Sequence, residues 1–410
     1  MMKTEQMNFD RIILHCDLNN FFASVECVLN PELKDKCIAV CGSEADRRGI
    51  VLAKNEKAKA CGVVTAEPIW KARQKCPSLV TVPPHHSLYH EYSKKVQEIY
   101  YRFTDQVEPF SIDECYLDVT GSTALFGNGE QIAYSIKETV KEELGLTISA
   151  GVSFCKIFAK LGSDMKKPDA VTCITKENFR EKVWGLSAGE LMGVGRASFE
   201  KLKDYGICTI GDLAAADENL MQRLLGVNGV QLKQYANGID DREVAKYGDY
   251  EAPKSIGHGM TTPADLTDND SVWKVILSLS AEIGSRLWDE CLSASGVCIS
   301  IKDNMMKTVS YRQKLANPTQ SPTVIANAAR EVFCQKHKWQ HGIRTVTVTA
   351  VDLVDSDCFC MPDMFGDYIK DEKHEKIDSV VDALRRKYGN DSVKNAVLIE
   401  DVGHEKHDEA

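Results

Sequence analysis

Two kinds of hydrophobic pattern follow each other at the start of the chain. Residues 12–16 form a short, continuous apolar run, which predicts a buried strand, and Asp17 stands at its end. Residues 21–29 then have helical spacing, with Asn19 or Asn20 as a capping residue. The pattern predicts a strand that leads through a short turn into a helix.

The same strand-and-helix pattern occurs again at residues 147–153 and 155–165, and it stops before Pro168. Between the two occurrences, residues 89–103 have helical spacing and residues 107–120 have the pattern of a hairpin. Together these segments predict a mixed α/β core.

The pattern changes beyond this core. Residues 177–245 read as short helices separated by glycines, which fits a small helical domain, and residues 246–253 read as a linker. The region that follows has alternating strand patterns at residues 256–262, 297–302, 308–315 and 344–351, with helical patterns at residues 271–289 and 323–336. The predicted order is β-α-β-β-α-β. The last fifty or so residues are acidic, with one predicted helix at residues 376–388.

The length and composition of the chain indicate a globular protein with several domains. A hydrophobic content of 43% with 12 prolines in 410 residues is typical of folded chains. No run of apolar residues reaches the length of a membrane span, and the first residues have no signal-peptide pattern. We expect a cytoplasmic protein that is a monomer.

The net charge of −10 argues mildly against a nucleic-acid partner, but the charge is unevenly distributed. Residues 30–80 have ten Lys/Arg against six Asp/Glu, and residues 254–350 have eleven against eight. Residues 359–410 have eight against thirteen. The two basic segments are candidates for contact with a phosphate backbone, although small excesses of this kind also occur on ordinary solvated surfaces.

Fifteen cysteines raise the question of disulfides or zinc. None is part of a CxxC pair, and most lie within apolar runs, as Cys16, Cys155 and Cys298 do. We therefore expect reduced thiols with a structural role.

Carboxylates supply the candidate chemistry. Asp17 lies at a strand end, and Asp113 and Glu114 lie in the predicted hairpin. Adjacent side chains of a strand point to opposite faces, so Asp113 and Glu114 can reach one site only if the chain bends there. Three carboxylates at one site would repel one another without cations, and two Mg²⁺ ions held in this way serve phosphoryl transfer. From the carboxylates alone, ordinary turn acids are the better interpretation.

Three motifs decide between these interpretations. Residues 17–26 (DLNNFFASVE), 111–114 (SIDE) and 151–161 (GVSFCKIFAKL) resemble, in the same order, the Y-family DNA polymerases of the DNA polymerase IV and UmuC-like type. The resemblance extends from about residue 11 to about residue 351. It implies a right-hand fold with palm, fingers, helical thumb and a β-α-β-β-α-β little finger.

The resemblance also implies domain limits. The palm would comprise residues 11–30 and 80–176, the fingers 31–79 and the thumb 177–245. The little finger would comprise residues 254–355, followed by a C-terminal tail at 356–410.

The metal and catalytic roles are likewise implied by the motifs. Asp17 and Asp113 would hold two Mg²⁺ ions, the carbonyl of Leu18 would be a further ligand, and Glu114 would complete the catalytic set. The substrates would be primer-template DNA and deoxynucleoside triphosphates.

The resemblance assigns the nucleotide contacts as well. Phe21, Phe22, Lys59 and Lys160 would bind the nucleotide, and Phe22 would be the steric gate that rejects ribonucleotides. In the fingers, Glu56 stands where the family commonly has a tyrosine, and Lys59 where it commonly has an arginine. An acid near a triphosphate is unfavourable unless it turns away or pairs with a lysine.

Two binding segments complete the expectations. Gly193, Gly195 and Arg196, followed by a helical pattern, resemble a helix-hairpin-helix that contacts a DNA phosphate through backbone N–H groups. Residues 361–365 (MPDMF) are a weak candidate for a sliding-clamp peptide, because methionine stands where the family has glutamine.

The expected function is error-prone, template-directed translesion synthesis without a proofreading exonuclease, in DNA damage tolerance and repair. Two other functions stay open at this point. A nucleotidyl cyclase or related phosphotransferase would use the same metals and strand-end acids, and a DNA-binding accessory protein would have an inactive site. Neither a helix-hairpin-helix nor a basic C-terminal module has a use in a cyclase.

Overall fold

A computed structural model describes residues 11–45, 47, 49–246, 248–249, 252–357 and 367–398, the first six residues of the last segment by their backbone alone. The chain forms two compact units. The first comprises Met1–Gly42 and Gly49–Tyr250, and the second comprises Ser43–Arg48 and Glu251–Ala410, as far as their residues are described. Within the described residues, no helix is both long and apolar enough to cross a bilayer.

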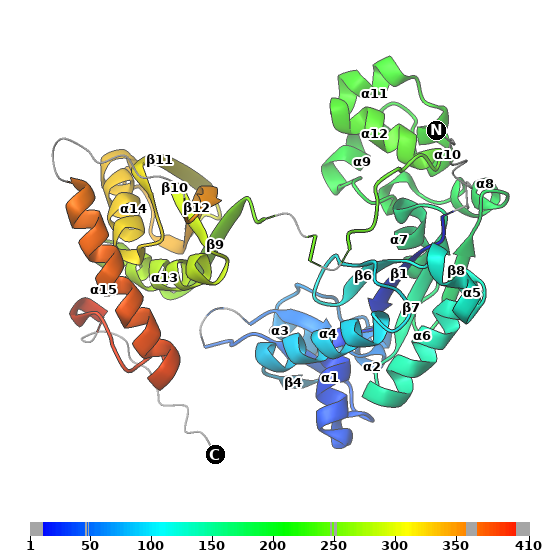
Figure 1. Cartoon of the computed structure of the whole chain (residues 1–410), viewed down its shortest axis with the longest axis horizontal. Helices are drawn as coiled ribbons and strands as arrows, with labels where there is room; N and C mark the ends of the chain where they lie inside the picture. Colours follow the sequence, from blue (N-terminus) through cyan, green and yellow to red (C-terminus); the bar gives the residue numbers. More distant parts are fainter. Residues whose placement is uncertain are drawn as a thin grey trace, which may run out of the picture. The chain divides into compact units, whose positions relative to one another are not determined.

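A five-stranded sheet forms the centre of the first unit, in the order β5-β6-β1-β7-β8 (Figure 1). All pairs are antiparallel except β7 with β8. The strands are β1 (Ile13–Leu18), β5 (Val107–Pro109), β6 (Glu114–Asp118), β7 (Ile148–Ser153) and β8 (Val171–Ile174).

Helices cover both faces of this sheet. One face packs against α1, α4 and α6 in a large apolar core, and the other packs against α7. The helices are α1 (Phe21–Leu29), α4 (His86–Tyr100), α5 (Thr123–Phe126), α6 (Gly129–Leu144) and α7 (Lys156–Met165), with a 3-10 turn, η2, at Thr120–Ser122. The expected hairpin and both strand-and-helix patterns are confirmed, whereas α4 begins three residues before the predicted start at residue 89.

A small three-stranded sheet in the order β3-β2-β4 has its own apolar core. Its elements are η1 (Pro31–Leu33), β2 (Ile38–Cys41), β3 (Val51–Lys54), α2 (Glu56–Ala60), α3 (Ile69–Lys75) and β4 (Val80–Val82). A third core, which includes apolar side chains of α7, holds the predicted short helices together. These are α8 (Phe179–Val183), η3 (Ala188–Glu190), α9 (Arg196–Lys203), α10 (Ile210–Ala215), α11 (Glu218–Leu225) and α12 (Val227–Ala236).

The second unit has the predicted β-α-β-β-α-β order, with the sheet order β11-β10-β12-β9. Helices α13 and α14 pack against the sheet and form one apolar core with it (Figure 1). Helix α15 begins at Asp367, earlier than predicted, and side chains on it hydrogen-bond to the start of α14. The elements are β9 (Ser255–Leu266), α13 (Asn269–Asp289), β10 (Leu292–Asp303), β11 (Thr308–Thr319), α14 (Pro322–Lys336), β12 (Ile343–Asp355), α15 (Asp367–Tyr388) and η4 (Ala396–Leu398).

Candidate active site

The alternation of β1 places Asp17 on the face of the sheet that α7 covers. Leu14, Cys16 and Leu18 point into the core with α1, α4 and α6, so His15 and Asp17 point to the opposite face. In the β1–β6 pair Asp17 lies directly opposite Glu114. Two carboxylates from neighbouring strands therefore share one face.

Asp113 reaches the same site because the chain bends before β6 begins. Residues 111–113 form bends, and the Asp113 carbonyl accepts a hydrogen bond from the Leu18 N–H at 3.0 Å. The Ser111 hydroxyl donates to the Asp113 carboxylate at 2.6 Å. Leu18, Asp17, Asp113 and Glu114 all line one pocket of about 290 Å³. The bend that the sequence requires is thus present.

Helix α7 lies close to the sheet because Gly151 of β7 has no side chain. A Cβ atom at Gly151 would lie 1.9 Å from the Ala159 carbonyl oxygen and 2.5 Å from the Ser163 N–H nitrogen. The close approach brings one face of α7 over β1, where the Ser163 hydroxyl lies 2.8 Å from His15 Nδ1.

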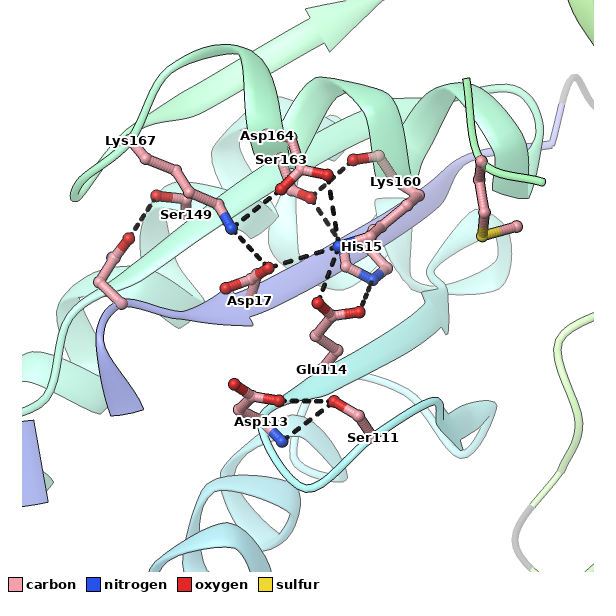
Figure 2. A network of polar contacts seen from close by, with 12 residues as sticks. His15, Asp17, Ser111, Asp113, Glu114, Ser149, Lys160, Ser163, Asp164 and Lys167 are labelled. Atoms are coloured by element: carbon pink, nitrogen blue, oxygen red, sulfur yellow. Dashed lines mark hydrogen bonds and ion pairs between the residues drawn. The ribbon is translucent and has the colours of Figure 1, made fainter. Parts of the chain in front are cut away.

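Two lysines form ion pairs with the acids (Figure 2). Lys160 Nζ lies 2.8 Å from Glu114 Oε1 and 3.5 Å from Asp17 Oδ2. Lys167 Nζ lies 2.7 Å from Asp17 Oδ2, and both lysines also contact Asp164, at 3.3 and 2.9 Å. The motif pointed to Lys160, but the sequence assigned no role to Lys167, which directly precedes the Pro168 that ends the helical pattern.

These surroundings move the pKa values of the two opposed acids apart. Burial raises the pKa of Asp17 to about 6, although Lys167 and Lys160 oppose the rise. The pKa of Glu114 lies well below its ordinary value, because contacts with His15 and Lys160 outweigh its burial. Burial lowers the pKa of His15, so the ring is neutral at neutral pH and lies 3.4 Å from Glu114.

The residues present fit divalent cations with oxygen ligands. The site has a formal charge of −2 when all its groups are ionised, because four acids face two lysines. The acids are Asp17, Asp113, Glu114 and Asp164, and the lysines are Lys160 and Lys167. The donors are hard carboxylate oxygens, as Mg²⁺ prefers. The oxygens of the three predicted ligands, all within the described residues, do not approach one another within 4.8 Å as a group. Carboxylates that repel one another are expected to stay apart until cations draw them together.

Phe21 and Phe22 line the same pocket but differ in their packing. Phe21 is 3% exposed and belongs to the core. Phe22 is half-buried, and its ring stacks on Tyr89 with centroids 4.1 Å apart and planes 12° apart. The side chain at position 22 is therefore a wall of the pocket supported from behind.

Glu56 is paired, which is one of the two arrangements that the sequence allowed. Its Oε1 accepts a hydrogen bond from the Asn20 side chain at 2.9 Å and lies 3.5 Å from Lys59 Nζ. The predicted side-chain cap on α1 is absent, because Asn20 stands at the N-cap with φ of 51° and binds Glu56 instead. Lys54 lines the pocket itself; sequence reasoning missed it, and no spacing marks it.

The remaining predicted residues lie elsewhere in the first unit. Gly193 and Gly195 are exposed on a loop that leads into α9, and Arg196 is the exposed first residue of that helix, while Val194 is buried. The element before this loop is the single 3-10 turn η3, so a full first helix of a helix-hairpin-helix is not formed there. The candidate clamp peptide at residues 361–365 lies outside the described residues.

Comparisons with known proteins agree with this geometry. The impB/mucB/samB family matches residues 16–164, and the C-terminal domain of that family matches residues 253–358. DNA polymerase IV of Acetivibrio thermocellus is 48% identical, over 96% of this chain and 98% of its own length. DNA polymerase IV 1 of Bacillus subtilis is 37% identical, over 95% and 93%.

A solved structure extends the agreement to the fold. A Y-family DNA polymerase chimera of Dbh and Dpo4 superposes with a TM-score of 0.75 at 25% identity, covering 84% of this chain and 99% of its own. This likeness confirms the expected multidomain α/β fold of the right-hand type. The chain therefore belongs to the impB/mucB/samB family and to the Y-family DNA polymerases.

Proposed function

We propose that this DNA-directed DNA polymerase extends a primer across damaged templates with the help of two Mg²⁺ ions. The observation that carries the proposal is the pocket that Asp17, Asp113 and Glu114 line together with the half-buried ring of Phe22. Membership in the family supports this class of reaction, and the pocket is the place where we expect the reaction to occur.

The ions would be held by the carboxylates of Asp17, Asp113 and Glu114 and by the carbonyl of Leu18. When bound, such ions polarise the transferring phosphate and favour ionisation of the primer 3'-hydroxyl. Lys160 and Lys167 hold the acids in place, and an incoming triphosphate offers their ammonium groups further anionic oxygens.

The fingers would complete the triphosphate site. Lys59, tied to Glu56, keeps positive charge near the pocket but lacks the two-pronged geometry of an arginine. Lys54 lines the pocket and is an additional candidate for a phosphate contact. Phe22, with Phe21 beside it, would pack against the sugar of the nucleotide.

We assign the parts of the hand as the motifs imply. The palm is residues 11–30 and 80–176, the fingers 31–79, the thumb 177–245 and the little finger 254–355, with a linker at 246–253 and a tail from 356. Gly193, Gly195 and Arg196 would contact a DNA phosphate. The enzyme would act as a monomer in damage tolerance, and because no second acidic cluster is evident in the motifs, it would not excise its errors.

A primer-extension assay with Mg²⁺ tests the proposal on an undamaged template and on one with an abasic site. We expect products whose length follows the template, including products that pass the abasic site. Formation of cyclic nucleotide instead would support a cyclase, and tight DNA binding without chemistry would support an accessory protein. A mismatched primer kept without nucleotides should keep its length; shortening would contradict the absence of proofreading.

A further inference from the structure

Three cysteines of the small β3-β2-β4 module meet at one point. Cys37 directly precedes β2, Cys61 directly follows α2 and Cys76 directly follows α3. Their Sγ atoms all lie within 4.8 Å of one another, and they form the one such group of thiol, imidazole or carboxylate ligands among the described residues. Elements that are distant in the sequence thus bring three soft ligands together, and no CxxC spacing in the sequence indicates this cluster.

The backbone holds the three positions in place. The Cys76 N–H donates to the Ala72 carbonyl at 2.9 Å, and the Cys37 carbonyl accepts from the Val80 N–H at 2.9 Å. Lys75 joins the two helix ends, because its Nζ donates to the carbonyl of Gly62, next to Cys61, at 2.9 Å. The thiols are therefore preorganised by the same contacts that build the module.

The three cysteines differ in how deeply their side chains are buried. Cys76 is 1% exposed and belongs to the apolar core of the module, Cys37 is half-buried and Cys61 is exposed. Thiols that only fill a core, such as Cys16, are buried without an open side. The cluster is open on the side of Cys61, through which an ion and a water ligand can enter.

The spacing suits a metal better than a disulfide. Tetrahedral zinc with Zn–S bonds of about 2.3 Å places two sulfurs about 3.8 Å apart, so three thiols within 4.8 Å need to close by no more than roughly 1 Å. A disulfide needs about 2.05 Å and uses two thiols, leaving the third without a role. The Ser78 hydroxyl lies 3.7 Å from Cys76 Sγ.

The local charge suits a thiolate site. The segment from residue 30 to residue 80 has four more basic than acidic residues. Three thiolates with one divalent ion have a charge of −1, which this surrounding offsets.

We propose that Cys37, Cys61 and Cys76 bind one thiophilic divalent cation of the Zn²⁺ class, with water as the fourth ligand. The ion would tie the ends of α2 and α3 to β2, in the segment that also presents Lys54 and Lys59. This site is separate from the carboxylate pocket and does not rest on the proposed polymerase activity.

Metal binding by the full chain tests the proposal. The protein is stripped with a chelator, kept reduced with a phosphine, and titrated with Zn²⁺ against a chromophoric chelator. Millimolar Mg²⁺ keeps hard oxygen sites filled. We expect one tightly bound Zn²⁺ per chain, and Co²⁺ in its place should give the charge-transfer absorption of thiolate ligation. A reduced parent chain that takes up no Zn²⁺ would overturn the proposal, whether or not a disulfide forms under oxidation.

Serine variants locate the site. Loss of a residue that only supports a metal ligand typically weakens metal binding by about 10–100-fold. Loss of a ligand itself, in Cys61→Ser or Cys76→Ser, should weaken Zn²⁺ binding by at least as much. Cys208→Ser, an exposed cysteine near α9, and the pair Cys358→Ser/Cys360→Ser, outside the described residues, serve as controls that should keep affinity. Retained affinity in Cys61→Ser would refute the assignment; this variant decides even if Cys76→Ser fails to fold, because Cys61 is exposed.

Discussion

The central sheets of the two units differ in whether charged side chains are buried on them. In the first unit, Asp17, His15 and Lys156 are buried on or beside the sheet, and each has an ionic or hydrogen-bonding partner. In the second unit, the buried polar residues among those described are serines and threonines, and no acid or base is buried. Burial of charge costs free energy unless it is paired, so its concentration in one sheet marks that sheet for chemistry.

The second sheet has another asymmetry. Alternate residues of β10, such as Val297, Ile299 and Ile301, are buried under the helices, while Lys302 on β10 and Lys314 on β11 belong to the alternate, outward-facing set. Alternation of this kind specifies a fold and leaves one face for a partner. We therefore propose that the first sheet carries catalysis and that the outward face of the second adds contacts to the DNA backbone, and four experiments can break or sharpen that comparison.

The largest effect is expected from the acids. Glu114→Gln and Asp113→Asn should lower single-turnover nucleotide addition by about 1,000-fold or more, roughly 4 kcal/mol, because the proposed ions would lose a ligand charge. Binding to primer-template should change by no more than a few-fold, since the duplex does not depend on these groups. Single-turnover kinetics and fluorescence anisotropy measure the two quantities.

Asp164→Asn is the matched control for these variants. Asp164 contacts the same two lysines but does not line the pocket. Its loss should reduce the rate by less than tenfold. Equal loss in Asp164→Asn, or near-normal rates in Glu114→Gln, would show that general charge balance rather than ligation governs the site.

The next effect concerns sugar selection and sharpens the comparison within the first unit. Phe22→Ala should keep deoxynucleotide insertion within about tenfold, 1.4 kcal/mol, yet raise ribonucleotide insertion by about 100-fold or more, because room opens for a 2'-hydroxyl. Loss of the stack on Tyr89 should cost about 0.5–1.5 kcal/mol of stability. Insertion efficiencies for both sugars, with thermal unfolding, provide the measurement.

Phe21→Ala separates a gate from a core residue. Phe21 is buried, so its truncation should cost about 3–5 kcal/mol of stability and depress both activities together. A folded Phe22→Ala chain that still rejects ribonucleotides as the parent does would refute the gate.

The comparison also explains what the sequence could predict. The strands and helices of the second unit were predictable because alternation and helical spacing depend on one buried face. Asp17, Asp113 and Glu114 were found because they stand at strand ends within motifs. Lys167, Lys54 and the three-cysteine cluster were not found, since their positions depend on loops and tertiary contacts that leave no period in the sequence. The short 3-10 turn before Gly193 was missed for the same reason, as one turn has no period to detect.

A smaller effect is expected from the outward face of the second sheet. Lys302→Ala together with Lys314→Ala should weaken primer-template binding by about tenfold and reduce the slope of log affinity against log salt by about 2, one for each lost phosphate contact. The insertion rate at saturating DNA should not change. Affinity measured at several salt concentrations gives both numbers.

Lys336→Ala with Lys338→Ala is the control, because both side chains are exposed and lie at or just after the end of α14 rather than on a strand. These variants should leave the salt slope as it is. An equal change in both pairs would mean that net charge, rather than the sheet face, determines binding.

The smallest effect is a pH dependence confined to the first sheet. Because burial raises the pKa of Asp17 to about 6, this acid is ionised at pH 7.5 and takes up a proton as the pH falls through 6. A protonated carboxyl is a poor ligand, so affinity for a divalent cation should fall by about fourfold between pH 7.5 and pH 5.5, following the ionised fraction. Mn²⁺, which takes the same oxygen ligands, allows electron paramagnetic resonance to report this affinity without nucleotide, whose phosphates would also titrate. Asp164→Asn should show the same fall, since Asp17 is unchanged in it. Mn²⁺ affinity that is flat over this range would mean that the cation is held without Asp17, and the ligand set proposed for the pocket would be wrong.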